Sequence, residues 1–324
     1  MNYEIKELNE KAEAYSEEIK KILKEIKKVI VGHEKILEKL LISLVANGHV
    51  LLEGAPGLAK TLMIKTLSET LHANFRRIQF TPDILPADII GTKIYNHKDS
   101  SFSTKKGPIF ANFILADEIN RAPPKVQSAL LEAMQERQVT IQGDTFEIKK
   151  PFLVLATQNP IEQEGTYPLP EAQLDRFMFN LILDYPRFDE ELDIVTRTTG
   201  GINNSVSKIV SAEEIIFFQQ LLRKIPVADN VLEYAVKLVS KTRPGTTDAH
   251  DWTNKFLNWG AGPRASQFLI IGAKVNAALS GKYSPDIEDV KAIALPVLRH
   301  RIIRNYKAEA EGITTDNIIE ELMK

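Results

Sequence analysis

Residues 49–71 constrain the fold of this chain more than any other part of the sequence. An apolar run at 49–53 leads directly into the loop Gly54-Ala55-Pro56-Gly57-Leu58-Ala59-Lys60-Thr61, and a helical pattern follows from Leu62. A strand, a glycine loop and a helix N-terminus in this order direct backbone N–H groups and the positive end of the helix dipole toward one point. The segment therefore predicts a parallel α/β sheet with an anion site at its edge.

Further apolar runs alternate with helical patterns, which is typical of a parallel sheet with helices on both faces. The predicted strands cover residues 49–53, 75–80, 112–116, 152–157 and 178–184. Two hairpins interrupt this order, at about 90–104 and at 139–148, the second turning at Gly143. After Pro186 the sequence shows helix starts instead of such strands, at Ser211, at Pro263 and at Ser284-Pro285-Asp286.

The pattern predicts three regions along the 324 residues. Residues 1–30 form an amphipathic helix, 31–186 a nucleotide-sized α/β core, and 187–324 a smaller all-helical domain. In the first region apolar residues recur at intervals of three and four, at Ile5, Leu8, Ala12, Tyr15, Ile19, Ile22, Ile26 and Val29. We favour packing of this stripe on the core, with an intermolecular coiled coil as the alternative.

Charge and composition narrow the classes of function. Lys and Arg number 41 against 43 Asp and Glu, which argues against a chain whose main task is to grip nucleic acid, although a local basic groove stays open. The absence of cysteine excludes disulfides and thiolate catalysis. The first residues lack an apolar leader and no apolar run approaches the ~20 residues of a membrane helix, so we expect a cytoplasmic protein without membrane insertion.

Polar residues at strand ends and loops carry the candidate chemistry. In the glycine loop, Lys60 can reach the β and γ phosphates of a nucleotide and Thr61 can offer its hydroxyl to Mg²⁺. A buried strand ends in Asp117 and Glu118, where Asp117 can hold Mg²⁺ through its water shell and Glu118 can polarise an attacking water. Taken alone, the loop is also compatible with a chance Gly-Pro-Gly turn and the acids with a helix N-terminus.

Three further residues fit phosphoryl chemistry when they are read with that site. Asn159 follows the strand at 152–157 and can hydrogen-bond the water or the γ phosphate, although an Asn-Pro turn explains it equally well. Arg176 precedes the fifth strand and Arg264 stands at a helix start. Either can be a structural surface arginine, but a fixed cation also stabilises charge on a transferring phosphoryl group.

These motifs and several longer ones resemble the MoxR family of ATPases in the AAA+ superfamily. The resemblance covers most of the chain. It rests on Val31-Gly32-His33, the loop Gly54 to Thr61, Gln79-Phe80-Thr81-Pro82-Asp83, Lys106-Gly107-Pro108, Ala116 to Pro124, Gln158-Asn159-Pro160, Gly165 to Phe177, and Gly262-Pro263-Arg264-Ala265-Ser266. Ala before the loop lysine is usual in that family, so Ala59 agrees with it.

The resemblance implies a role for each matching position. Lys60 and Thr61 are similar to the Walker A pair, Asp117 and Glu118 to the Walker B pair, and Asn159 to the first sensor. Arg176 resembles an arginine finger that acts on the neighbouring subunit, with Arg121 as the competing candidate. Arg264 resembles the second sensor on a helical lid. The implied nucleotide contacts are Val31, Gly32, Gly54, Ala55, Pro56, Gly57, Leu58, Ala59, Lys60, Thr61, Leu62, Asp117 and Arg264.

The resemblance also implies an activity and partners. We expect an ATP-hydrolysing protein that uses Mg²⁺, assembles as a homo-oligomeric ring of about six subunits, and remodels or activates a client protein, in some relatives one with a von Willebrand factor A domain. One alternative is a DNA-translocating motor, because relatives with the same hairpins move DNA. The other is a small-molecule kinase of the P-loop type.

Overall fold

The computed structural model describes residues 16–98, 100–160, 165–200 and 205–324. These residues form two compact units. One contains the described residues between 21 and 176 and between 181 and 216, and the other contains residues 16–20, 177–180 and 217–324. The first unit holds the large sheet and the second is mainly helical, so the predicted α/β fold with a helical domain is confirmed.

A five-stranded parallel sheet forms the centre of the first unit, in the order β2-β5-β8-β1-β9. Its strands are β1 (Val50–Gly54), β2 (Phe75–Gln79), β5 (Phe113–Asp117), β8 (Leu153–Gln158) and β9 (Phe179–Leu183). The three central strands are almost wholly buried. This burial explains their continuous apolar runs, because helices cover both faces of a parallel sheet. All five predicted strands are confirmed, each within one or two residues at its ends.

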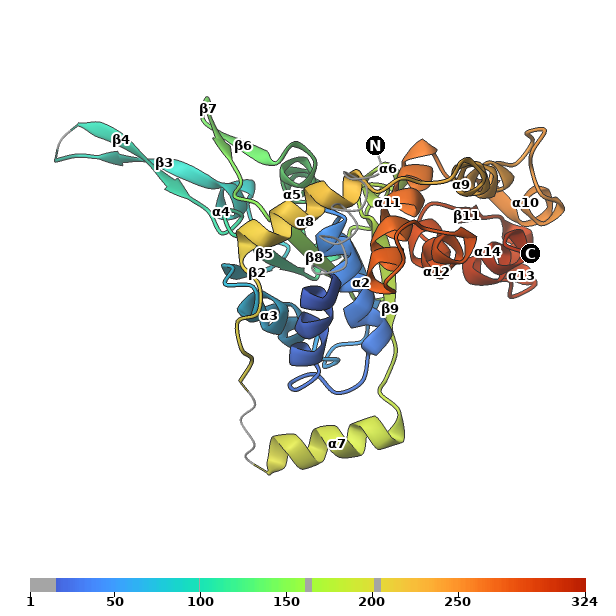
Figure 1. Ribbon diagram of the computed structural model, residues 1–324. Helices are drawn as coiled ribbons and strands as arrows, with labels where there is room; N and C mark the ends of the chain where they lie inside the picture. The colour runs from blue at the N-terminus through green and yellow to red at the C-terminus, as the bar shows by residue number, and fades with distance from the viewer. Residues whose placement is uncertain (1–15, 99, 161–164, 201–204) are drawn as a thin grey trace. The chain divides into compact units, whose positions relative to one another are not determined.

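Both hairpins predicted from the sequence are present, and they project from the same side of the sheet (Figure 1). The first pairs β3 (Gly91–Asn96) with β4 (Ser101–Lys106), and the second pairs β6 (Gln138–Ile141) with β7 (Asp144–Glu147). Lys93 joins them, since its Nζ lies 2.9 Å from Asp144 Oδ2. The helices of this unit are α2 (Glu34–Val45), α3 (Lys60–Thr70), α4 (Pro86–Ile90), η1 (Ile119–Arg121), α5 (Pro124–Glu136), α6 (Glu171–Leu174) and α7 (Phe188–Thr199).

The second unit packs its helices around an apolar core that includes Leu269, Ile293 and Val297. Its elements are α9 (Asp229–Lys241), α10 (Asp251–Phe256), β10 (Leu257–Trp259), α11 (Pro263–Leu279), α12 (Ile287–Leu298), β11 (Ile303–Arg304), α13 (Tyr306–Ala310) and α14 (Thr315–Leu322), and α8 (Ala212–Arg223) begins in the first unit. The predicted helix starts at Ser211 and Pro263 are confirmed. The third start was placed too early, because Asp286 caps α12 and leaves Pro285 outside the helix.

The N-terminal stripe can be followed only in part. Residues 16–26 are helical, and Ile19, Ile22 and Ile26 on that stripe are buried. The predicted apolar positions Ile5, Leu8, Ala12 and Tyr15 lie outside the described residues. Among the described residues, no helix combines the length and apolar character needed to cross a membrane.

His49, at the start of the sheet, gives the first unit a dependence on pH. Its Nδ1 accepts a hydrogen bond from Val154 N at 3.0 Å, so Nε2 carries the proton and faces Met134 O at 3.2 Å. Burial, together with the charge of Arg137, holds the pKa of His49 well below its ordinary value. The folded chain therefore requires a neutral ring, whereas the unfolded chain takes up a proton near pH 6.5.

We expect the free energy of unfolding to fall as the pH drops from 7.5 to 5.5. The contribution of His49 reaches at most about 1.4 kcal/mol per pH unit below pH 6.5, because the unfolded state binds the extra proton there. Urea unfolding at several pH values measures this slope. His49→Gln should flatten it, and the exposed His72→Gln is the matched control. An unchanged slope in His49→Gln would contradict the assignment.

Candidate functional site

The glycine loop after β1 is closed by its own lysine. Lys60 Nζ donates a hydrogen bond to Gly54 O at 2.5 Å. Ala59 caps α3 in the left-handed conformation, with φ at 56°, which costs an alanine roughly 1–2 kcal/mol. Gly54 has no room for a side chain, since a Cβ there would lie 2.7 Å from Leu183 O. The loop is therefore a strained turn held in place by β9 and by Lys60.

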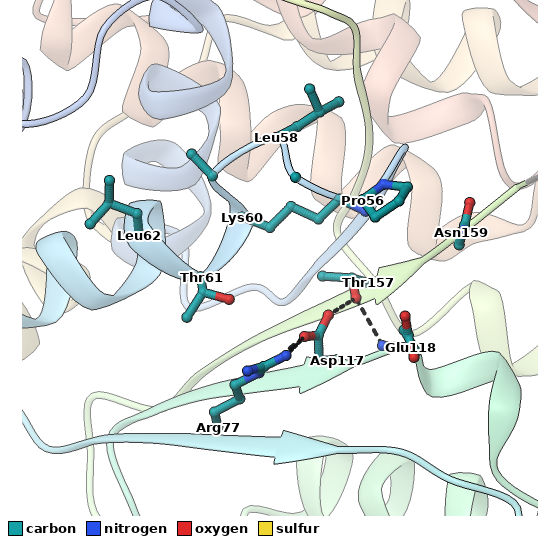
Figure 2. Close-up of a pocket in the computed structure, with 12 residues that line it drawn as sticks. Pro56, Leu58, Lys60, Thr61, Leu62, Arg77, Asp117, Glu118, Thr157 and Asn159 are labelled. Atoms are coloured by element: carbon teal, nitrogen blue, oxygen red, sulfur yellow. Dashed lines mark hydrogen bonds and ion pairs between the residues drawn. The ribbon is translucent and has the colours of Figure 1, made fainter. Parts of the chain in front are cut away.

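A cavity of about 410 Å³ lies between this loop and the carboxyl ends of the strands (Figure 2). It brings together residues that the sequence predicted from three separate strand ends. Its lining consists of Pro56, Gly57, Leu58, Ala59, Lys60, Thr61, Leu62, Arg77, Asp117, Glu118, Thr157 and Asn159. Burial lowers the pKa of Lys60, and the charges of Asp117 and Glu118 oppose that shift. The cavity thus combines two cations, Lys60 and Arg77, with two acids and a helix N-terminus.

Asp117 is fixed through both of its carboxylate oxygens. Arg77 Nε and Nη2 donate to Oδ2 at 3.0 and 2.6 Å, and the Thr157 hydroxyl donates to Oδ1 at 2.6 Å (Figure 2). Thr157 also accepts the backbone N–H of Glu118 at 2.9 Å. One hydroxyl on β8 therefore sets the position of both acids that follow β5.

Glu118 is held at Oε2 by two neighbouring side chains. Gln79 Nε2 donates to Glu118 Oε2 at 2.9 Å, and Arg121 Nε lies 3.2 Å from the same oxygen. Gln79 is in turn held by Arg77, whose Nη2 donates to Gln79 Oε1 at 2.7 Å. Glu118 also lines the cavity, where its carboxylate can accept a hydrogen bond from a water molecule. The arrangement suits a carboxylate that orients and deprotonates water.

Arg77, Gln79 and Thr157, which hold the two acids, were not predicted as site residues from the sequence. Arg77 and Gln79 alternate along β2, and the register places Gln79 directly opposite Asp117. A signal for Thr157 was present, because it is the last buried residue of β8, beside the strand that carries the acids. Gln79 opens the family motif at 79–83, but nothing in the sequence of β2 distinguishes Arg77 from a polar residue of an ordinary edge strand.

A second, mostly apolar cavity of about 150 Å³ shares Gly57, Leu58, Ala59 and Leu62 with the first. Its other walls come from segments far apart in the sequence: Val29, Ile30, Val31 and His33 before α2, and Pro186, Ile194, Arg197 and Thr198 around α7. Burial lowers the pKa of His33, against the opposing charges of Glu190 and Asp184. An apolar cavity beside an anion site matches the two halves of a nucleotide, the base and the phosphates.

The donors in the larger cavity fit a magnesium ion held mainly by phosphate. Thr61 offers a hydroxyl and Asp117 a carboxylate, and the described residues contain no cluster of three or more His, Asp or Glu side chains suited to a metal. Magnesium commonly keeps several waters and binds through one or two carboxylates plus substrate phosphates. Since Arg77 and Thr157 occupy both oxygens of Asp117, contact through water fits better than direct ligation.

Four predicted residues of the first unit, Gly32, Gly54, Ala55 and Arg176, do not line either cavity. Gly32 forms the turn before α2, with φ at 71°, and Gly54 and Ala55 form the base of the loop. Arg176 follows α6, and its Nη1 donates to Leu131 O at 3.0 Å. Arg264 belongs to the second unit, in the first turn of α11.

The chain is similar to known proteins over nearly its whole length. Residues 49–179 match the ATPase family associated with various cellular activities (AAA), and residues 251–322 match the AAA lid domain. Chaperone MoxR1 of Mycobacterium tuberculosis is 45% identical over 93% of this chain and 79% of its own length. The YeaC protein of Bacillus subtilis is 42% identical over 96% of both chains. A crystal structure from Cytophaga hutchinsonii, 46% identical, superposes with a TM-score of 0.89 over 99% of this chain and 97% of that one.

Proposed function

This chain belongs to the MoxR family of the AAA+ ATPases, and from that premise we propose that it hydrolyses ATP to ADP and phosphate in order to remodel or activate a client protein. The observation that carries the proposal is the shared cavity of Lys60, Thr61, Asp117, Glu118 and Asn159. Its loop, acids and amide are the parts that phosphoryl transfer from a nucleotide requires.

The residues of the cavity divide the work of binding the phosphates and activating the attacking water. The N–H groups of the loop, from Gly54 to Leu62, cradle the phosphates, and Lys60 exchanges its bond to Gly54 O for the β and γ phosphate oxygens. Glu118 takes the proton of the attacking water, and Asn159 hydrogen-bonds the water or the γ phosphate. The smaller cavity, with Val31 on its wall and Gly32 shaping the turn beside it, receives the adenine.

Thr61 and Asp117 are the residues that would hold Mg²⁺. When bound, the ion neutralises the negative charge that develops on the phosphate oxygens. Asp117 contributes a carboxylate that is fixed in place, since Arg77 and Thr157 bind its two oxygens. The hydroxyl of Thr61 stands at the first turn of α3, where the helix dipole favours anions.

Two arginines complete the proposed mechanism. Arg176 acts on the nucleotide of the neighbouring subunit in a homo-oligomeric ring of about six, and Arg264 contacts the γ phosphate from the helical lid. Hydrolysis removes the partner of Arg264, and the lid then relaxes. The binding energy of ATP is thereby converted into movement that acts on the client, for which a von Willebrand factor A domain is the candidate.

Lys60→Ala tests the nucleotide site. We expect the affinity for ATP to fall by about 100-fold, because the loss of a charge-assisted contact is worth about 2–3 kcal/mol. Titration with a fluorescent ATP analogue measures binding, and phosphate release measures turnover. Lys65→Ala, on the exposed face of the same helix, is the matched control and should behave as the parent. Absence of ATP hydrolysis by the parent chain at any concentration would refute the proposal.

The alternatives have less support. A nucleic-acid motor would use basic hairpins, but Lys93 of the first hairpin is neutralised by Asp144, and Lys106 lies over the rings of Phe110 and Phe146. A small-molecule kinase has no use for an arginine in the position of Arg176. The relatives that match over most of their length include a chaperone.

A further inference from the structure

Three consecutive basic residues after α12 bind one short stretch of backbone. Arg299 Nη1 donates to Asn180 O at 3.0 Å, and the His300 Nε2 lies 3.1 Å from Phe177 O. Arg301 donates to Phe177 O through Nη2 at 2.6 Å and to Met178 O through Nη1 at 3.3 Å. We call these three side chains the carbonyl clamp. Residues 177–180 belong to the same compact unit as the clamp.

Two of the three clamp residues are buried, and both arginines are held in fixed orientations. His300 and Arg301 are 9% and 6% exposed. The Arg301 guanidinium also donates to Val297 O and stands 5.1 Å from the ring of Phe268. Arg299 makes a bidentate pair with Asp316, at 2.7 and 2.6 Å. Buried cations require well-placed acceptors, so this cluster tolerates little displacement of the carbonyls it binds.

The bound carbonyls begin one peptide bond after Arg176. The backbone angles of Phe177 and its neighbours determine the direction in which Arg176 leaves the chain, because only two soft dihedrals separate consecutive peptides. On its other side Arg176 is held by Leu131 O. Arg176 is absent from the lining of both cavities described above, which accords with action outside its own nucleotide site.

We propose that Arg299, His300 and Arg301 are positioning residues that set where Arg176 is presented to the neighbouring subunit. The inference rests on the proposed function, in which Arg176 acts in trans. The contacts of the clamp with residues 177–180 are made to carbonyl oxygens, so they fix the path of the backbone itself. A displacement of about 1 Å of a catalytic group can lower a rate by up to about 100-fold. Loss of one hydrogen bond from the clamp to these carbonyls should therefore lower turnover measurably.

Arg299→Gln is the first variant. We expect turnover to fall by about 10-fold while the KM for ATP changes by less than about twofold, because the subunit's own nucleotide site is untouched. Lys291→Gln, on the exposed face of α12, is the matched control and should leave turnover unchanged. A larger change in KM than in turnover would overturn the proposal.

Mixing of subunits separates positioning of Arg176 from a general structural role. Glu118→Gln subunits lack the proposed base but keep an intact Arg176, which they can offer to a neighbour. Mixed with them, Arg299→Gln subunits should hydrolyse ATP several-fold faster than the two preparations assayed apart. Arg176→Ala subunits should be rescued in the same way, and a defect confined to a subunit's own site should not.

The mixtures distinguish failure of the clamp from failure of the trans action of Arg176. If Arg176→Ala is rescued and Arg299→Gln is not, the clamp proposal is overturned and the trans action of Arg176 stands. If neither is rescued, the trans action fails and the clamp proposal fails with it. Should Arg299→Gln not fold, Arg301→Lys is used in the same mixtures, since it keeps the cation but loses the fork that reaches two carbonyls.

Discussion

Replacing Arg176 by alanine is expected to lower ATP turnover by about 10³-fold while the affinity for ATP changes by less than about threefold. An arginine that stabilises the transferring phosphoryl group contributes about 10³-fold or more, and it contributes in the transition state instead of the ground state. Phosphate release and titration with an ATP analogue measure the two quantities separately. Arg187→Ala, an exposed arginine paired with Asp189, is the matched control.

The losses of turnover and of ATP affinity in Arg176→Ala together show whether this arginine acts in trans. Equal losses of both would contradict a trans-acting arginine, because they would indicate damage to the subunit's own site. Arg121 is the competing candidate, but it lies 3.2 Å from Glu118 of the same chain. Its replacement should therefore disturb the subunit's own acid, a defect that a neighbouring subunit cannot repair.

Glu118→Gln is the second change with a large expected effect. We expect turnover to fall by about 10³-fold, or about 4 kcal/mol of barrier, with ATP binding retained. The amide preserves the size of the side chain but cannot accept the proton of the attacking water. Single-turnover phosphate release measures the chemical step. Glu132→Gln, exposed on α5, is the matched control, and residual turnover above about a tenth of the parent rate would exclude Glu118 as the base.

The same variant has a practical use. A chain that binds ATP without hydrolysing it should remain in the ATP-bound arrangement, and a client that prefers this arrangement stays associated. Capture of a protein by Glu118→Gln with ATP, compared with Lys60→Ala under the same conditions, would therefore identify candidate clients.

Most of the fold could be predicted from the sequence because its strands and helices have clear local patterns of apolar residues. Buried parallel strands are continuous apolar runs, and residues at their carboxyl ends meet at one edge. Lys60, Asp117 and Asn159 could therefore be grouped before any coordinates were known, and the structure places them on one cavity.

The residues that hold the two acids in place could not be predicted in the same way. Arg77 binds Asp117 across β2 and β5, two strands that are neighbours in the sheet but 38 residues apart at their paired ends. Register between such strands depends on how the whole sheet packs. The residues of α7 on the smaller cavity were missed for a related reason, because Ile194 and Thr198 belong to an ordinary amphipathic pattern in the sequence.

The smaller cavity has a thermodynamic consequence. Its walls come from residues before α2, from the glycine loop and from α7, segments separated by up to about 170 positions. A ligand that binds only when these walls are assembled adds its binding free energy to the stability of that assembly, by about 2.7 kcal/mol at 100 times its Kd. The nucleotide would thus stabilise the first unit as well as supply the energy of hydrolysis. A fall in cellular ATP would therefore reduce the amount of folded protein along with its activity.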